Sequence, residues 1–134
     1  MLFRSRDNAY MQRLNRGQPY IVIGQEDAKA RDISDGDWVR CFNDVGEFKV
    51  RAKVVTSARP GQTIMYHSWE NYQFAGKGDA RSVSPSPINP VELAGDHAHL
   101  KIGMLEGQPG CFDRDTRIEI EKLSADEAAR LRRT

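Results

Sequence analysis

The sequence predicts a mainly β domain with short helices, arranged as a small barrel. Short runs rich in β-branched and aromatic residues recur along the chain, separated by turn residues, and give about six strands. The segments with helical spacing are only one to three turns long, which is too short for the crossover helices of a parallel βαβ sheet. A small barrel explains this combination better than such a sheet does.

Length and composition favour one ordinary globular domain. The 134 residues, which we treat as a single domain 1–134, are enough to bury a modest core. Twenty basic residues stand against nineteen acidic ones, so nucleic acid is not an expected partner. No apolar run approaches the ~18 residues of a membrane span, and we expect no direct membrane insertion. Residues 1–6 lack the apolar stretch of a secretion signal.

The basic N-terminal stretch predicts a short amphipathic helix followed by a strand. Tyr10, Met11 and Leu14 recur at helical spacing, and Gly17 stands where a glycine commonly ends a helix. Residues 19–23 form a β-branched apolar run that predicts a buried strand.

A second short helix is expected at 26–31, where acids come first and bases last, as suits the helix macrodipole. Asp32 follows at the position where a left-handed residue lets the chain leave the helix. Glycine adopts that conformation most easily, and Asp is among the few tolerated substitutes. Ile33 is expected to add an apolar contact, and residues 35–37 form the next turn.

The clearest pattern is a β-hairpin with one buried side. Residues 38–42 lead into a tight turn at 43–46, and the return strand alternates strictly. Its buried face is expected to carry Phe48, Val50, Ala52 and Val54. A turn at 58–61 then precedes a strand at 63–66.

Regular patterns are sparse in the second half of the chain. Residues 67–86 have none, and so long an irregular stretch is typical of a functional loop. A short helix is expected at 91–94 and a closing strand at 117–121. Residues 123–134 predict a charged C-terminal helix, and Ser124 begins it in the manner of a capping box.

The most informative chemistry lies just past the predicted strand 63–66. Tyr66, His67, Ser68 and Trp69 supply a phenol, an imidazole, a hydroxyl and an indole at a place where ligands commonly bind. Such a set suits a flat heteroaromatic ligand. The alternative is that Trp69 and Tyr72 belong to the core while His67 caps a strand. Spacing alone favours neither interpretation.

Other reactive side chains form no recognisable catalytic or metal centre. His97 and His99 are two residues apart, but no third ligand has suitable spacing, so we expect hydrogen-bonding histidines and no metal. Cys41 and Cys111 are expected to be packing thiols. The sequence contains no GxSxG motif, no P-loop and no supported Cys–His pair, so we expect no catalytic residues in this chain.

Several motifs together are similar to the C-terminal domain of the dimethyl sulfoxide reductase family. Gln25-Glu26-Asp27-Ala28 followed by Ile33-Ser34-Asp35-Gly36-Asp37-Trp38-Val39 resembles one signature, and the stretch PGQTIMYH resembles another. Within the family, the chain looks most like the branch of nitrate reductases and ethylbenzene, dimethyl sulfide, selenate and (per)chlorate enzymes. The resembling segments are residues 25–39, 42–48, 59–67, 88–95 and 113–116. The likeness covers about residues 6–122.

The resemblance implies a double-psi β-barrel that closes over bis(molybdopterin guanine dinucleotide). The implied contacts to pterin and nucleotide are Tyr66, His67, Ser68, Trp69 and Asn89, with His99 a weaker candidate. In the family, the molybdenum is held by the pterin dithiolenes and a residue from elsewhere, so no metal ligand is expected here. The cofactor carries the electron chemistry, and the protein positions and tunes it.

The resemblance also implies that this chain is the C-terminal part, or a fragment, of a molybdenum oxidoreductase catalytic subunit and is not catalytic alone. Its partners would be the remaining domains of that subunit and an iron–sulfur subunit. The branch is often exported, which suits a periplasmic parent whose signal would stand further upstream. Substrate and direction of reaction are set by other domains.

Three departures from the family pattern affect these expectations. Residues 1–5 do not match the family's first barrel strand and its histidine-bearing stretch, so the barrel is expected to lack that strand. Cofactor binding by this chain alone is therefore left open. Asp32 replaces a usual glycine, and His97 replaces a position that is commonly aromatic.

Two other classes of function were weighed against cofactor binding. A free-standing double-psi barrel can act as a protein-interaction module, because a fold does not fix a function. An exposed apolar groove without a cofactor-shaped cleft would indicate that class. A small barrel enzyme such as a decarboxylase is disfavoured, since no nucleophile is paired with a base.

Overall fold

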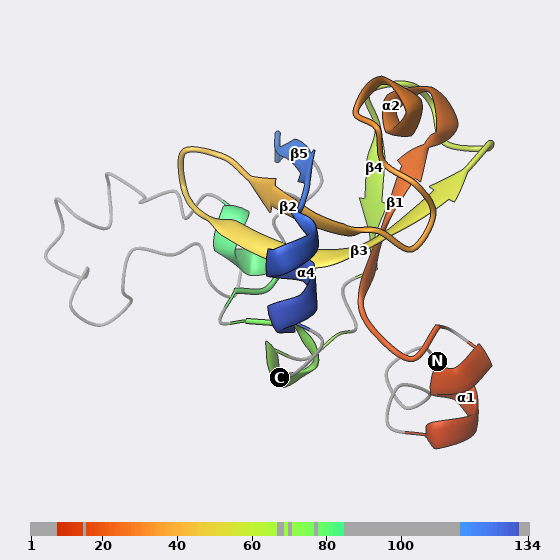
Figure 1. Ribbon diagram of the computed structural model, residues 1–134, viewed down its shortest axis with the longest axis vertical. Helices are drawn as coiled ribbons and strands as arrows, with labels where there is room; N and C mark the ends of the chain where they lie inside the picture. The colour runs from red at the N-terminus through yellow and green to blue at the C-terminus, as the bar shows by residue number, and fades with distance from the viewer. Residues whose placement is uncertain are drawn as a thin grey trace, which may run out of the picture.

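The computed structural model describes residues 8–14, 16–66, 69, 71–76, 78–84 and 116–131. Its centre is a mixed five-stranded sheet of order β4-β1-β3-β2-β5 (Figure 1). The strands are β1 Tyr20–Gly24, β2 Trp38–Phe42, β3 Glu47–Val55, β4 Thr63–Met65 and β5 Glu119–Lys122. The helices are α1 Ala9–Leu14, α2 Gln25–Ala30, α4 Ala125–Leu131 and the 3-10 helices η1 Asn71–Gln73 and η2 Ala80–Val83. The mainly β class with short helices is confirmed.

Strand β1 lies inside the sheet and is buried along its whole length. It pairs antiparallel with β4 and parallel with β3, where Tyr20 stands opposite Arg51. Such a continuous apolar run is typical of a strand covered on both faces. The sequence disfavours a parallel βαβ sheet, and the sheet is mixed, with β1 and β3 as its parallel pair. The connection from β1 to β3 holds the whole of β2 as well as α2, and this length of chain suffices for a crossover.

The predicted hairpin is formed by β2 and β3, which pair antiparallel with Cys41 opposite Phe48. The expected face of β3 is buried at Phe48, Val50 and Ala52, and it is half-buried at Val54. Cys41 is completely buried, and burial raises the pKa of its thiol well above the usual range. A thiol in that state packs and does not react.

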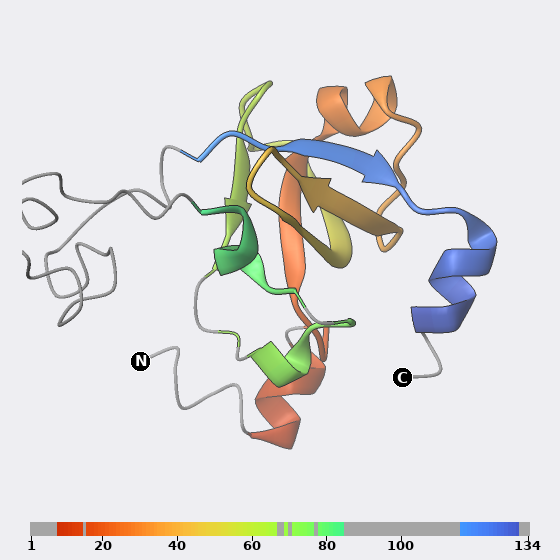
Figure 2. The ribbon, with the colours of Figure 1, turned by 90° about the vertical axis from the view of Figure 1, so that its left-hand side faces the viewer.

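The sheet is open in the part of the chain that the structure describes. β4 and β5 form its two edges, so the closed barrel expected from the sequence is not completed by these residues. In Figure 1, β1 and β4 run across the direction of β2 and β3, which shows a strong twist. Helix α2 lies at one end of β1 and α1 lies at the other (Figure 2).

Helix α2 ends as the sequence predicts. Asp32 adopts a left-handed conformation with φ of 52°. The Asp32 amide donates to the Lys29 carbonyl at 3.3 Å, and the Ile33 amide donates to the Ala28 carbonyl at 2.8 Å. This is the Schellman pattern, and the buried Ile33 supplies its apolar contact.

Helix α1 is present, but its predicted apolar stripe is not buried by the described residues. Asn8 caps the helix, because its Oδ1 accepts the Tyr10 amide at 2.9 Å. Gly17 has φ of 70° and donates its amide to the Gln12 carbonyl at 2.6 Å, which closes the C-terminal turn. Tyr10 and Leu14 are both strongly exposed.

The later elements follow the prediction where the structure describes them. The strand expected at 117–121 is β5, and the charged C-terminal helix is α4. Ser124 caps the helix, because its Oγ accepts the Glu127 amide at 3.4 Å, and its hydroxyl donates to the Glu127 carboxylate at 2.9 Å. The stretch expected to be irregular contains η1 and η2, and the helix expected at 91–94 lies outside the described residues. None of the helices in the described residues is long and apolar enough to cross a membrane.

Replacing Asp32 by glycine should stabilise the chain. Glycine adopts a positive φ without the steric strain of a Cβ atom, so Asp32→Gly should raise the free energy of unfolding by about 1 kcal/mol. Asp44→Gly is the matched control in an exposed turn, where φ is not positive. That variant should lower the free energy of unfolding, because glycine adds freedom to the unfolded chain. Denaturant unfolding of the purified variants measures both free energies of unfolding. If the two variants change by the same amount, Asp32 is not strained.

Candidate functional site

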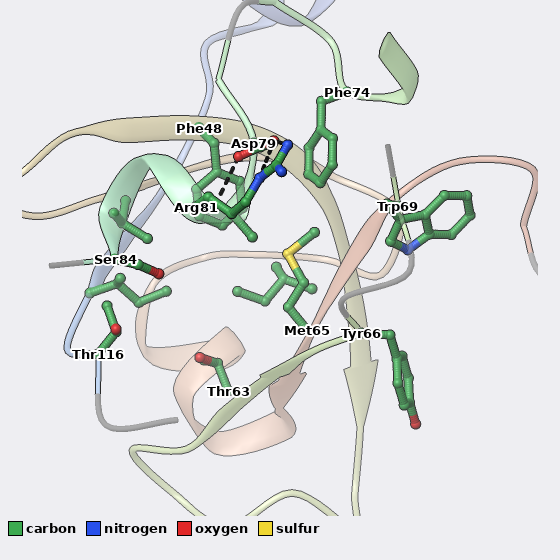
Figure 3. A pocket seen from close by; sticks show the side chains of 14 residues that line it. Phe48, Thr63, Met65, Tyr66, Trp69, Phe74, Asp79, Arg81, Ser84 and Thr116 are labelled. Atoms are coloured by element: carbon green, nitrogen blue, oxygen red, sulfur yellow. Dashed lines mark hydrogen bonds and ion pairs between the residues drawn. The ribbon is translucent and has the colours of Figure 1, made fainter. Parts of the chain in front are cut away.

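A cavity of about 310 Å³ opens beside β1, β3 and β4 (Figure 3). Ile21 of β1 and Phe48 of β3 contribute from the sheet. The rest of its lining comes from two walls, one that follows β4 and one built from residues 74–84 together with residues just before β5. The lining residues of these walls are Thr63, Met65, Tyr66, Trp69, Phe74, Asp79, Ala80, Arg81, Val83, Ser84, Thr116 and Ile118.

The wall after β4 is aromatic and is supported from within the sheet. Tyr66 and Trp69 both meet the ring of Tyr20 edge to face, at centroid distances of 6.4 and 6.5 Å. The Lys53 ammonium lies 4.9 Å from the centre of the Tyr20 ring. Because Tyr20 belongs to the buried strand β1, it supports both aromatic side chains at the cavity from within the sheet.

The two cavity aromatics differ in exposure. Trp69 is 8% exposed and Tyr66 is 45% exposed. In Figure 3 the Tyr66 hydroxyl points away from the cavity, while the Met65 side chain points into it. Across the cavity, the rings of Phe48 and Phe74 meet edge to face at 6.2 Å. The lining therefore offers apolar and aromatic surface to a flat ligand.

An ionised carboxylate is fixed in the opposite wall. Asp79 is only 5% exposed, and its Oδ1 accepts the Arg81 amide at 2.9 Å. Its Oδ2 accepts from the Arg81 guanidinium Nε at 3.0 Å and from the Asn71 side chain at 3.2 Å. The Asp79 amide donates to the Ser82 hydroxyl at 3.1 Å, which completes a capping box at the start of η2. The Arg81 guanidinium keeps the pKa of Asp79 below its ordinary value.

The arrangement can bind a flat ring system but offers no metal centre. Its volume lies at the lower end of the range for small-molecule pockets, roughly 300–1,000 Å³. The hydroxyl-bearing residues Thr63, Ser84 and Thr116 provide polar groups beside the apolar and aromatic lining residues. Among the described residues, no three His, Cys, Asp or Glu side chains are grouped so that they could hold a metal ion.

Two of the six predicted contact residues can be placed, and the structure brings them together. Tyr66 and Trp69 both line the cavity. The other four lie outside the described residues; they are His67, Ser68, Asn89 and His99. The alternative interpretation places Trp69 and Tyr72 in the core. Trp69 is indeed buried, but the assignment is wrong for Tyr72, which is 75% exposed.

Sequence reasoning missed the residues that support the site from elsewhere. Tyr20 was assigned only to a buried strand, and the wall residues Phe74 and Arg81 were not singled out. Asp79 could have been noticed, because Asp followed three residues later by Ser is a helix-capping spacing. Nothing local to the other three positions signals that they converge on one cavity.

Comparison with known proteins identifies the family of this chain. Residues 4–95 match the model of the molydopterin dinucleotide binding domain. The chain is 34% identical over 128 residues to the respiratory nitrate reductase subunit alpha of Haloferax mediterranei, which covers 91% of the chain and 13% of that protein. It is 36% identical over 117 residues to the perchlorate reductase subunit alpha of Dechloromonas aromatica, which covers 87% of the chain and 13% of that protein.

A third relative is the respiratory nitrate reductase 1 alpha chain of Escherichia coli, 35% identical over 126 residues. That match covers 87% of the chain and 10% of the relative. The chain thus corresponds to a small part of each of these alpha subunits.

Removing the charge of Asp79 should destabilise this wall. Asp79→Asn replaces charge-assisted hydrogen bonds, so we expect a loss of about 1–3 kcal/mol in the free energy of unfolding at neutral pH. The folded pKa of Asp79 lies below its ordinary 3.8, so its contribution is present above that pH and is lost as pH falls through the folded pKa. The variant should therefore lose less stability below pH 3.8 than the wild type does.

Asp44→Asn, in an exposed turn, is the control and should change stability by less than about 0.5 kcal/mol. Thermal unfolding is measured for all three proteins between about pH 2 and about pH 7, a range that spans the ordinary Asp pKa of 3.8. If Asp79→Asn loses as much stability at low pH as the wild type does, the stabilising role of the ionised Asp79 is contradicted.

Proposed function

This chain belongs to the molydopterin dinucleotide binding domain family, and on that premise we propose that it forms one side of a site for bis(molybdopterin guanine dinucleotide). The observation that carries the proposal is the cavity beside Tyr66 and Trp69, at the end of the strand within the family-matched residues. Aromatic and apolar surface with a few polar groups suits a flat pterin or guanine ring.

The described residues fit such a ligand. Tyr66 and Trp69 offer ring faces or edges, and the Thr63, Ser84 and Thr116 hydroxyls can exchange hydrogen bonds with heteroatoms of a ring. We propose His67, Ser68, Asn89 and His99 as further contacts, on the resemblance of their motifs. When bound, the cofactor supplies the electron transfer. The residues of this chain bind it, orient it and exclude water from it.

We propose further that the chain acts within a larger molybdenum-dependent oxidoreductase. The matched relatives are alpha subunits of nitrate and perchlorate reductases, and the chain spans 10–13% of their length. The partners in this proposal are the remaining domains of a catalytic subunit and an iron–sulfur subunit. The metal is held by the cofactor and by a residue outside this chain, and this chain contributes no catalytic residue.

The finer fold in this proposal is a double-psi β-barrel that lacks its first strand, formed by one domain, 1–134. The open edges at β4 and β5 and the strong twist support it, since an open twisted sheet can be closed by further strands. The alternative of a protein-interaction module predicts an exposed apolar groove without a cleft. The aromatic-lined cavity of about 310 Å³ favours cofactor binding over that alternative.

A cofactor-retention experiment tests the proposed function. The chain is expressed alone and with its upstream coding sequence in a host that makes the cofactor. Fluorescent oxidised pterin, released guanine nucleotide and molybdenum are then measured per protein. We expect all three in at least the longer protein. Their absence from both proteins would exclude the proposed function.

Tyr66 and Tyr72 provide a matched pair for locating the site. Both tyrosines are exposed, but only Tyr66 of the two lines the cavity. Contact of an aromatic ring with a base is worth ~1–3 kcal/mol, so Tyr66→Ala should lower cofactor affinity about tenfold or more. Tyr66→Phe keeps the ring and should behave like the wild type, as should Tyr72→Ala. Retained pterin after dialysis measures this; equal loss in Tyr66→Ala and Tyr72→Ala would place the ligand elsewhere.

A further inference from the structure

Asn43, in the turn between β2 and β3, joins three parts of the chain through one side chain. Its Nδ2 donates to the carbonyl oxygens of Val83 at 2.7 Å and Arg117 at 3.1 Å, which are 40 and 74 residues away. Its Oδ1 accepts the amides of Val45 at 2.9 Å and Gly46 at 3.2 Å. All the hydrogen-bonding capacity of a side-chain amide is therefore used.

The two carbonyls belong to the segments that complete one wall of the cavity. Val83 and the next residue, Ser84, line it from one segment, and Thr116 and Ile118 line it from the other. In Figure 2 the end of η2 and the residues before β5 lie on the same side of the sheet. A single nitrogen contacts both segments, so it fixes their separation directly.

The backbone of the β2–β3 turn also packs directly against the backbone of this wall. A Cβ atom at Gly46 would lie 2.5 Å from the Ser82 carbonyl oxygen, and one at Gly78 would lie 2.5 Å from the Glu47 carbonyl oxygen. Glycine is thus required on both sides of the contact. The turn and residues 78–83 pack as one unit, and Asn43 extends that unit to the residues before β5.

We propose that Asn43 is a positioning residue for the ligand of this cavity. It holds residues 80–84 and 116–118, the two segments of one wall, at a fixed separation from each other and from the β2–β3 turn, without lining the cavity itself. A ligand held between the walls then binds more tightly because the protein does not have to order one wall on binding. This inference rests on the proposed function, since it assumes a cofactor in this cavity.

Asn43→Asp separates the two roles of the side chain. The carboxylate still accepts the amides of Val45 and Gly46, so the turn is kept. It donates nothing when ionised, and it repels the carbonyls of Val83 and Arg117. Val45→Ala is the matched control, since Val45 is exposed in the same turn and its amide is unchanged. Asn43→Ser is a second variant, which removes the two N–H donors of the amide without adding charge and leaves one hydroxyl donor on a shorter side chain.

The first measurement uses the complete 134-residue chain and needs no cofactor. In Asn43→Asp at pH 7, amide hydrogen exchange should accelerate about tenfold at residues 80–84 and 116–118 together and stay unchanged in β1. A Trp38→Phe background leaves Trp69 as the single indole of the chain, and its quenching by acrylamide should increase in Asn43→Asp and not in Val45→Ala. A residue that shaped only the turn would alter exchange at 42–48 and leave both wall segments unchanged.

The second measurement uses the cofactor-loaded protein. Asn43→Asp and Asn43→Ser should retain about tenfold less pterin and guanine nucleotide after dialysis than Val45→Ala, as expected for two lost hydrogen bonds. If Asn43→Asp does not fold, Asn43→Ser decides the result. If the wild type carries no cofactor, the proposed function fails, and the inference fails with it. If the wild type is loaded and both variants retain as much as Val45→Ala, the positioning role of Asn43 is overturned while the proposed function stands.

Discussion

Strand β3 pairs with two different strands along its length, and the positions of the other strands depend on this change of partner. Residues 47–51 pair antiparallel with β2, and residues 51–55 pair parallel with β1, so Arg51 is the position of β3 that faces both. Its guanidinium lies 4.5 Å from the centre of the Trp38 ring and donates to the Gly36 carbonyl at 2.5 Å. Where β3 has no strand neighbour, other residues pair with it: Lys49 forms a bridge with Ala75, and the Ala52 amide donates to the Asp37 carbonyl at 2.8 Å. The cavity lies beside Phe48, in the first half of the strand.

The cavity therefore depends on contacts between distant parts of the sequence. Tyr20, at the start of β1, supports the aromatic wall, and the β2–β3 turn supports the opposite wall through Asn43 and Gly46. Tyr20 lies in the sheet, and Asn43 and Gly46 lie in the tight turn that joins two of its strands, while the residues that they hold lie outside the sheet. Ligand sites are commonly built in this way, because a loop gains a defined position only from a scaffold that is itself ordered.

The contrast between local patterns and contacts of distant residues explains which features could be predicted from the sequence. The hairpin and the left-handed Asp32 were predictable, since alternation and turn chemistry are local properties. Parallel pairing of β1 with β3 was not, because it depends on strand partners that no short window contains. Asn43 illustrates the same limit: in sequence it is an ordinary turn residue, and its partners Val83 and Arg117 become visible only in three dimensions. Tyr66 and Trp69 could be singled out locally, because they follow a strand end, but their role as ligand contacts rests on the family resemblance.

The charged groups of the described residues suit binding better than chemistry. Asp79 is ionised and held by Arg81 and Asn71, and Arg40 is shared between Glu47 and Glu121. The Cys41 thiol is buried with a raised pKa, which makes it a poor nucleophile. A general base or nucleophile needs a free lone pair within reach of a substrate, and groups held in this way lack one. Such a wall can orient a redox cofactor and exclude water from it, and the electron chemistry then belongs to the cofactor.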